Sequence, residues 1–311
     1  MFRIGWYGLG SMGQAMATNL QRHLAAQKAP NLTFSNRTMS RGDVLKSLGA
    51  KPKTDFKEVV AKCDIIFTMV SNNQVHNTLI QNAVTSEHDL RGKIFVDCST
   101  IHPGTVQESV EKLRAKEASF LAAPVFGGPS IAEEGKLVFA IGGPKEASEV
   151  VKPFIQDVMG RKVIDCGEDA SRASLLKVAG NIVTLNLMEA VAEAQVFAEK
   201  TDLGTDLMEE VIGEAFGPIA GGYSKRLTTG AYAPHPYSLP GFSVSNAIKD
   251  AGIAISIAKK HSAFVPGLRI ARNNMEIARR YAGRHLDSTS MYGTLRQQSR
   301  MEFWNEKARQ D

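Results

Sequence analysis

The chain has 311 residues, of which 43% are hydrophobic and 22% charged, and its formal net charge is +5. This length and composition fit a globular protein of about two domains. The positive charge lies in no block of five or six Lys and Arg residues and no apolar run reaches about 18 residues, so we expect neither a nucleic-acid partner nor a membrane span. A mild positive excess suits an anionic small molecule.

The first half of the chain alternates between predicted strands and predicted helices. Short apolar runs predict strands at 2–7, 32–35, 65–70, 94–97, 119–122, 137–142 and 162–165. Amphipathic patterns predict helices at 11–24, 40–48, 74–83 and 105–116. The alternation predicts an α/β fold, with one doubly wound and mostly parallel sheet carrying helices on both faces.

The pattern changes near residue 169, where helix formers run without strong breakers to residue 200. Further helices are predicted at 205–215, 242–260, 266–282 and 288–299, and the Gly- and Pro-rich segment 217–241 is predicted to be a loop. We therefore expect a Rossmann-type domain at 1–167 and an all-α domain at 168–311, joined by a long helix.

Three well-separated cysteines form no C-x-x-C pair and are expected to be reduced thiols. The seven histidines show no metal-ligand spacing, so no metal site is predicted. The first strand starts at residue 2 or 3, which leaves no room for a cleaved leader, and a cytoplasmic location is expected.

A glycine motif follows the first predicted strand and opens the first predicted helix. This is the context in which G-x-G-x-x-G binds the pyrophosphate of a dinucleotide. The spacing allows a tight turn, a close approach of the backbone to the phosphates, and close packing of helix on strand. The predicted cofactor residues here are Gly8, Leu9, Gly10, Ser11, Met12 and Gly13.

The end of the second strand reads Ser35-Asn36-Arg37-Thr38 and lacks the acidic residue that usually binds the ribose hydroxyls of NAD. Arg37 can instead pair with a 2′-phosphate, while Asn36 and Thr38 add hydrogen bonds. The sequence therefore predicts NADP as the cofactor.

Several blocks in order then resemble the β-hydroxyacid dehydrogenase family, which includes 3-hydroxyisobutyrate dehydrogenase and the glyoxylate/succinic semialdehyde reductases. The blocks are GLGSMGQAMATNL at 8–20, DCSTIHP at 97–103, APVFGG at 123–128, LKVAGN at 176–181 and Lys249-Asp250. The resemblance extends over residues 3–300. It implies a 6-phosphogluconate dehydrogenase-like Rossmann domain, a hydride-transfer reaction and a small-molecule substrate.

The resemblance also implies roles for the matching residues. Cofactor contacts are implied for Val70, Ser71, Thr100 and Lys249, and substrate contacts for Ser99, Phe126, Gly127, Gly128 and Asp250. Ser71 stands where the family often has proline. Ala122 and Phe126 replace the acid and the serine of the family's D-A-P-V-S-G-G loop, so Phe126 either points into the core or lines an apolar substrate pocket.

The resemblance places Lys177 in the family's catalytic helix. A hydride added to a carbonyl leaves an alkoxide that needs a proton, and a suitably placed lysine can donate it or remove it in reverse. Asn181 is four residues later on the same helical face, so it can orient the amine or the substrate. Lys177 and Asn181 are the predicted catalytic residues.

The leading hypothesis is an NADPH-dependent oxidoreductase acting on a β-hydroxyacid, a semialdehyde or an oxo acid. An imine reductase on the same fold is an alternative that Phe126 keeps open, although related imine reductases typically lack a lysine at the place of Lys177. A catalytically inactive cofactor-binding protein is the third hypothesis. The apolar C-terminal helices suggest a homodimer.

Overall fold

The computed structural model describes residues 1–235 and 237–308, which form two compact units, Met1–Lys177 and Val178–Asp311. The division falls inside one long helix. Each unit has a hydrophobic core of its own. The predicted boundary after residue 167 stays a prediction.

A six-stranded parallel sheet lies at the centre of the first unit, with the strand order β3-β2-β1-β4-β5-β6. The strand order reverses beside β1, and open α/β sheets bind ligands at the carboxyl ends of the strands at such a point. The strands are β1 (Ile4–Tyr7), β2 (Thr33–Ser35), β3 (Lys51–Pro52), β4 (Ile65–Thr68), β5 (Ile94–Asp97) and β6 (Ser119–Ala122).

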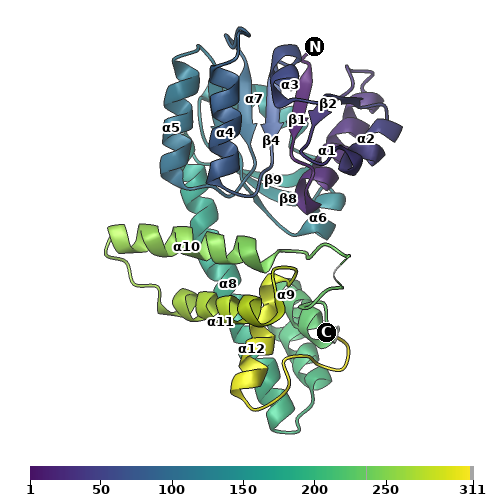
Figure 1. The fold of residues 1–311 in the computed structure, drawn as a ribbon, viewed down its shortest axis with the longest axis vertical. Coiled ribbons are helices and arrows are strands. Elements are labelled where there is room, and N and C mark those ends of the chain that lie inside the picture. The colour runs from purple at the N-terminus through teal and green to yellow at the C-terminus, as the bar shows by residue number, and fades with distance from the viewer. Residues whose placement is uncertain (236, 309–311) are drawn as a thin grey trace. The chain divides into compact units, whose positions relative to one another are not determined.

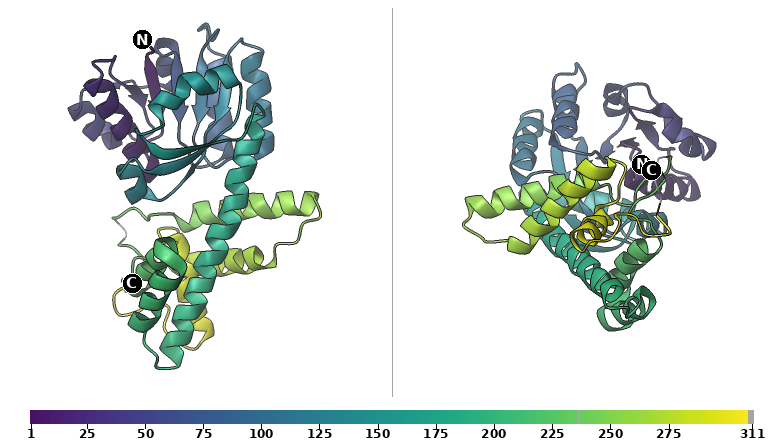
Figure 2. Two further views of the ribbon diagram at one scale, coloured as in Figure 1. Left: turned by 180° about the vertical axis from the view of Figure 1, so that it is seen from behind. Right: turned by 60° about the horizontal axis from the view of Figure 1, so that its bottom comes forward.

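Helices cover both faces of this sheet (Figures 1 and 2), which confirms the predicted α/β fold. In Figure 1, α4 and α5 lie side by side in front of the sheet, and they contact each other. The helices of the first unit are α1 (Ser11–Ala26), α2 (Asp43–Ser47), α3 (Phe56–Lys62), α4 (Asn73–Val84), α5 (Pro103–Arg114), α6 (Pro129–Glu133) and α7 (Lys145–Val151), with 3-10 turns at Met39–Gly42 and Lys152–Phe154.

A second, three-stranded sheet corrects one expectation. The predicted strands at 137–142 and 162–165 do not extend the main sheet but pair with each other and with an unpredicted short strand, in the order β7-β8-β9. These strands are β7 (Val125–Phe126), β8 (Leu137–Ile141) and β9 (Gly160–Asp165). Apolar runs predict strands but not the sheet in which a strand lies, because pairing partners depend on tertiary packing.

An aromatic pair in the core of the main sheet anchors the first turn of the chain. Trp6 of β1 is fully buried and stacks on Phe67 of β4 with the ring centroids 5.6 Å apart. Its indole nitrogen donates a hydrogen bond to the carbonyl of Gly8 at 3.0 Å. A buried indole N–H needs such a partner, so the core side chain also anchors the turn that follows β1.

The long helix α8 (Ala170–Lys200) leads into the second unit, which is helical in its described residues. Its further helices are α9 (Thr205–Thr228), α10 (Val244–Lys260), α11 (Pro266–Ala282) and α12 (Met291–Gln298), with a 3-10 turn at Ser288–Ser290. In the described residues, α8 is the helix long and apolar enough to cross a membrane. This is weak evidence, because the core helix of a soluble protein has the same features.

The predicted loop at 217–241 is wrong over its first part, because α9 continues to Thr228. Gly217 leaves the helical conformation at φ 82° and ψ 175°, and the helix resumes with Pro218. Proline is well tolerated in the first turn of a helix, where its missing N–H has no partner in any case. The Gly-Pro pair therefore kinks α9 and does not end it.

A buried carboxyl group marks the core of the second unit. Glu189 on α8 is 5% exposed and accepts a hydrogen bond from the amide of Asn274 on α11. Burial raises the pKa of Glu189 to about 7, with the Asn274 hydrogen bond acting in the opposite direction and Glu193 adding a further increase. The folded chain therefore binds this proton more tightly than the unfolded chain does.

We predict that Glu189→Gln removes a pH-dependent loss of stability. The contribution of Glu189 is fully present below its unfolded pKa of 4.5 and is lost as the pH rises through about 7, a loss on the order of 3 kcal/mol. Urea unfolding at pH 5 and pH 8 measures it, and the variant should be the more stable protein at pH 8. Glu193→Gln, on the exposed side of α8, should keep most of the pH dependence. Parallel pH profiles for the parent and Glu189→Gln would contradict the assignment.

Candidate active site

The turn after β1 packs backbone against backbone. Gly8 has φ +101°, and a Cβ on it would lie 2.1 Å from the carbonyl oxygen of Met69. A Cβ on Gly13 would lie 2.0 Å from the carbonyl oxygen of Gly8. A Cβ on Gly10, by contrast, would meet nothing within 4 Å. Two glycines therefore allow close packing, and the third leaves open space at the start of α1, where a pyrophosphate can approach.

Asn36 connects this turn to the end of β2. Its Oδ1 accepts a hydrogen bond from the backbone N–H of Leu9 at 2.9 Å, and its Nδ2 donates to the carbonyl of Thr38 at 2.7 Å. The side chain of Asn36 thus holds the turn in place. Arg37, which lies between Asn36 and Thr38 in the sequence, is exposed.

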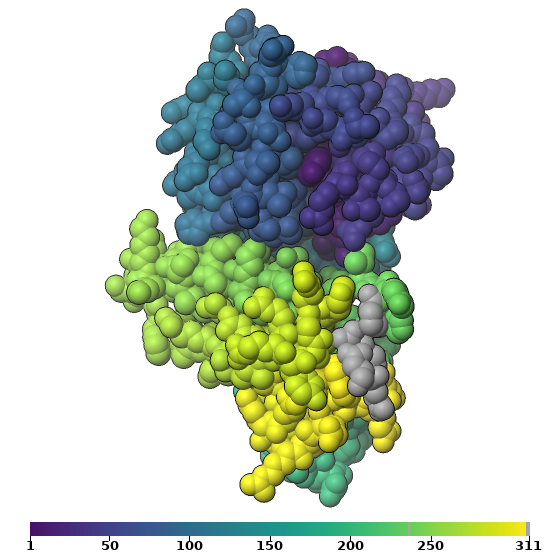
Figure 3. All heavy atoms as spheres, in the orientation of Figure 1, coloured from purple at the N-terminus to yellow at the C-terminus, as the bar shows by residue number. Residues whose placement is uncertain are grey.

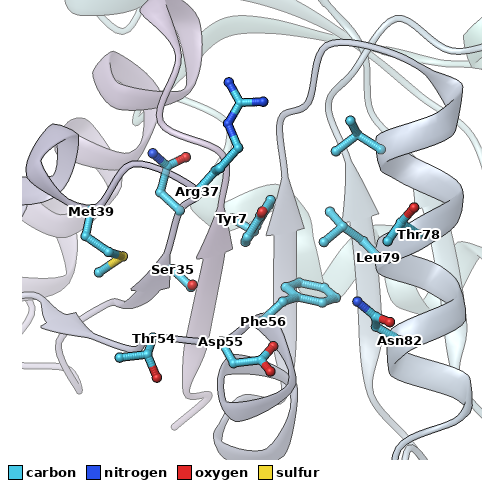
Figure 4. Close-up of a pocket in the computed structure, with 12 residues that line it drawn as sticks. Tyr7, Ser35, Arg37, Met39, Thr54, Asp55, Phe56, Thr78, Leu79 and Asn82 are labelled. Carbon is cyan, nitrogen blue, oxygen red and sulfur yellow. The ribbon is translucent and has the colours of Figure 1, made fainter.

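A pocket of about 410 Å³ lies beside Arg37. Figure 4 shows Arg37 and Asp55 toward opposite ends of this pocket, with Tyr7 between them. Figure 3 shows that atoms from the start of the chain, in purple, reach the surface between the segments that follow them in the sequence. The lining residues are Tyr7, Ser35, Asn36, Arg37, Met39, Thr54, Asp55, Phe56, Val75, Thr78, Leu79 and Asn82.

The charges at the two ends of the pocket oppose each other. Burial raises the pKa of Tyr7, while Arg37 lowers it and Asp55 raises it. The ring of Tyr7 packs edge-on against Phe56 with centroids 5.3 Å apart. The arrangement offers a slot with aromatic side chains, a cation at one end and an acid at the other, which could accept the adenosine end of a dinucleotide.

The predicted residues after β4 and β5 lie together at the carboxyl ends of these paired strands. Val70 and Thr100 are partly exposed, and Ser71 is exposed. Ser99 is 2% exposed, and its hydroxyl accepts a hydrogen bond from the N–H of Val70 at 2.8 Å. The structure therefore joins the two predicted segments through Ser99.

Lys177 is positioned by the first turns of α8. The hydroxyl of Ser174 donates a hydrogen bond to the carbonyl of Ile101, which ties α8 to the loop after β5. Lys177 Nζ lies 4.7 Å from the centroid of the Phe126 ring, in a cation–π arrangement. Lys177 and Phe126 are both partly buried. The structure thus brings the block at 97–103, the loop at 123–128 and the predicted proton donor together.

The loop after Phe126 has a backbone conformation that requires glycine at one position. Gly127 has φ +127°, which L side chains rarely adopt, and a Cβ there would also lie 2.7 Å from Leu137 Cδ2. Gly128 is the N-terminal cap residue of α6. Ala122, where the family has an acid, is buried at the end of β6 and exchanges backbone hydrogen bonds with Gly142.

The remaining predicted residues belong to the second unit. Asn181 is 2% exposed, and its Nδ2 donates a hydrogen bond to Oδ2 of Asp250 at 2.8 Å. Lys249 Nζ lies 2.8 Å from Oδ1 of Asp250. The structure therefore brings these three residues together on α8 and α10. In the part of the chain that the structure describes, no group of three or more His, Cys, Asp and Glu side chains could hold a metal ion.

Sequence reasoning missed the buried pair of His76 on α4 and Asp97 on β5. His76 Nδ1 lies 3.5 Å from Asp97 Oδ1, and both side chains are 1% exposed. Asp97 opens the block at 97–103, but no sequence pattern indicates that a histidine on α4 faces it. It also missed Tyr7, Asp55 and Phe56 in the pocket, because they come from segments that no single motif connects.

Comparison with known proteins gives the class. Residues 3–167 match the family model of the NAD binding domain of 6-phosphogluconate dehydrogenase, and residues 172–295 match that of the NAD-binding domain of NADP-dependent 3-hydroxyisobutyrate dehydrogenase. An NADH-dependent oxidoreductase of Aspergillus ustus is 32% identical over 296 residues, which cover 94% of this chain and 98% of that relative. The fold and the matches define an NAD(P)-dependent dehydrogenase or reductase.

The chain belongs to the β-hydroxyacid dehydrogenase family, as its sequence blocks predict. The solved 3-hydroxyisobutyrate dehydrogenase of Mycobacterium tuberculosis, described with L-serine, is 26% identical at a TM-score of 0.76 and covers 95% of this chain and 99% of its own. An imine reductase from Pseudomonas sp., 16% identical at a TM-score of 0.62 and covering 94% and 99%, shares the fold.

We predict opposite outcomes for alanine at two glycines of the turn. Gly10→Ala should fold with the thermal stability of the parent, because its Cβ meets open space and its φ of −77° suits alanine, but should bind a nicotinamide cofactor at least tenfold more weakly. Gly13→Ala should lower the stability by about 1–3 kcal/mol, because its Cβ meets backbone. Thermal melts measure the stability of both variants, and cofactor titrations measure their affinity. A Gly10→Ala protein with parental cofactor affinity would contradict the assignment of this turn as the pyrophosphate-binding site.

Proposed function

We propose that this protein is an NADPH-dependent reductase of a small carbonyl compound that bears a carboxylate, with Lys177 as the general acid. The reverse oxidation of a β-hydroxyacid would use the same residue as the general base. The observation that carries the proposal is the place of Lys177. Its ammonium lies over Phe126, on a helix tied to the loop after β5.

Lys177 suits proton transfer for a physical reason. Its ammonium lies on the face of an aromatic ring, which attracts a cation without accepting its proton in a strong hydrogen bond. In this position the ammonium can act as the proton donor to an alkoxide that forms on the substrate. A nicotinamide cofactor, when bound, would supply the hydride, and Lys177 would supply the proton.

The pocket beside Arg37 supports NADPH over NADH. Arg37 is exposed at one end of the pocket, away from Asp55 in Figure 4, and a guanidinium can bind a phosphate through paired hydrogen bonds. The family model with the NADP-dependent description supports the same preference, whereas the Aspergillus relative is described as NADH-dependent. Replacing Arg37 therefore tests the preference for NADPH over NADH.

Phe126 supports a partly apolar substrate pocket. The ring of Phe126 is not fully buried, and one of its faces meets Lys177. We therefore infer that Phe126 lines the substrate pocket as well as packing on the core. The backbone of Gly127 and Gly128 is then left to bind the carboxylate.

An imine reductase is the second candidate, and Phe126 is the observation that favours it. An apolar wall beside a proton donor suits a cyclic imine as well as a carbonyl compound. Lys177 favours the first candidate and also argues against an inactive protein. A screen of NADPH oxidation with small aldehydes, oxo acids and cyclic imines separates the candidates, and turnover of imines alone would replace the first by the second.

Other assignments stay predictions. The roles of Asn181, Lys249 and Asp250 are consistent with their hydrogen bond and ion pair, and the cytoplasmic location is an expectation from the sequence. Exposed apolar side chains on α8 and α9 support the homodimer, since a second copy can cover them. They are Val183, Phe197, Leu207, Val211, Phe216 and Ile219.

We predict that Arg37→Ala weakens NADPH binding about 10- to 100-fold, because a charged hydrogen bond contributes about 1.5–3 kcal/mol, and leaves NADH binding nearly unchanged. Calorimetric titration of both cofactors measures the difference. Arg22→Ala, at an exposed arginine of α1 outside the pocket lining, is the matched control and should bind both as the parent does. Equal affinities for the two cofactors that persist in Arg37→Ala would overturn the NADPH assignment.

We predict that Lys177→Ala lowers kcat by about 10²- to 10⁴-fold, the usual contribution of general acid–base catalysis, while NADPH affinity stays close to that of the parent. Steady-state kinetics with the best substrate of the screen and a cofactor titration provide the two numbers. Arg172→Ala, at an exposed cation on the same helix, should keep its turnover. Near-normal turnover in Lys177→Ala would remove this residue from the chemistry.

A further inference from the structure

A buried polar network lies under the carboxyl ends of β4 and β5. Asp97 is 1% exposed, and its Oδ1 accepts hydrogen bonds from the hydroxyls of Thr68 at 2.6 Å and Ser99 at 2.8 Å. Buried carboxylates are costly unless they are hydrogen-bonded and paired with charge. The cost of burying Asp97 at the end of two central strands suggests that this carboxylate has a role besides filling the core.

The direction of the Ser99 hydroxyl gives that reason. Its single proton is donated to Asp97, so its oxygen accepts the N–H of Val70 at 2.8 Å. Without an acceptor at Asp97, the hydroxyl could turn its proton toward the N–H of Val70, where two donors would oppose each other. Asp97 thus determines whether Ser99 can hold Val70.

His76 faces the same carboxylate from α4. The hydroxyl of Ser109 donates its only proton to the carbonyl of Thr105 at 2.8 Å, so it accepts the Nε2–H of His76, also at 2.8 Å. The other ring nitrogen, Nδ1, then faces Asp97 Oδ1 at 3.5 Å, and it donates toward this oxygen when the imidazole carries both protons. The edge of the imidazole is further confined by Phe120, whose ring centroid lies 5.8 Å from that of His76.

The carboxylate is kept in its ionised form. Burial alone would raise the pKa of Asp97, but the charge and hydrogen bond of His76 and the hydroxyls of Thr68 and Ser99 lower it below its ordinary value. Ala122 pairs with Asp97 in the register of β5 and β6. An acid at that position would place a second carboxyl group beside Asp97, and alanine avoids this repulsion.

We propose that Asp97 and His76 are positioning residues that hold the Ser99 hydroxyl on the N–H of Val70 and thereby set the Val70–Ser71 segment for the cofactor. The inference rests on the proposed function, which takes this segment to lie beside a nicotinamide dinucleotide. His76 and Asp97 act through Ser99, because both are 1% exposed. Met69, directly before the segment, also packs on Gly8, so a displaced Val70 would disturb the turn as well.

Two substitutions of His76 separate this role from simple packing. Asn places its amide nitrogen near the position of Nδ1 and can still donate toward Asp97. Gln places its amide nitrogen near Nε2 and can still donate toward Ser109. Gln is closer to histidine in size, so a role in packing alone favours Gln, whereas the proposed role favours Asn.

The test measures the dissociation constants of NADPH and NADH and kcat at saturating cofactor. Ser99→Ala and His76→Gln should each bind the preferred cofactor about tenfold more weakly, the effect of one buried hydrogen bond, and His76→Asn should stay within about threefold of the parent. The two His76 variants should keep kcat within about threefold at saturating cofactor, because Lys177 is untouched. Thr68→Val is the matched control. It removes a hydroxyl from the same carboxylate oxygen but not from Val70, so its affinity should stay near parental.

Two outcomes overturn the inference. His76→Gln binding the cofactor as well as or better than His76→Asn would assign the histidine to packing, and this comparison holds even if Ser99→Ala fails to fold. Parental affinity in both Ser99→Ala and His76→Gln would show that the network does not act on the cofactor. If the parent itself binds neither NADPH nor NADH, the proposed function fails first and this inference fails with it.

Discussion

The contact of backbone with backbone at the first turn is the constraint on which the rest of the structure depends. Gly8 and Gly13 have no room for a Cβ because the carbonyl oxygens of Met69 and Gly8 occupy it. This contact fixes the start of α1 against the end of β4, and Trp6 fixes the same turn to the core. A Cβ on Gly10, by contrast, would meet nothing within 4 Å. The turn is therefore held by backbone packing, to which the Asn36 side chain adds its hydrogen bonds.

The candidate site divides its tasks between backbone and side chains. In the proposed site, glycine turns at 8–13 and 127–128 would present backbone to ligands, while Arg37, Phe126 and Lys177 would determine which ligands fit and how they react. The buried pair of His76 and Asp97 is proposed to support the Val70–Ser71 segment. Such a division lets members of one family keep the backbone and change substrate through a few side chains.

The sequence was sufficient for the α/β fold, the long helix and the family, because each depends on local periodicity or on a contiguous motif. The helix at 266–282 was predicted to the residue, since Pro266 opens it and Gly283 ends it. The second sheet and the His76–Asp97 pair were not predictable, because they depend on which distant segments meet. The extension of α9 past Gly217 was missed, since the same Gly-Pro pair can end a helix or kink it.

Asn36 has a consequence for efforts to redesign cofactor preference. Its amide bridges the backbone of Leu9 and Thr38, accepting from one and donating to the other. An aspartate at this position, the usual change for binding a free ribose, could accept from Leu9 but could not donate to Thr38. One side chain, Asn36, therefore links the end of β2, where the adenosine would bind, to the conformation of the glycine turn after β1. Engineering that spares Asn36 and varies its exposed neighbours leaves that linkage intact.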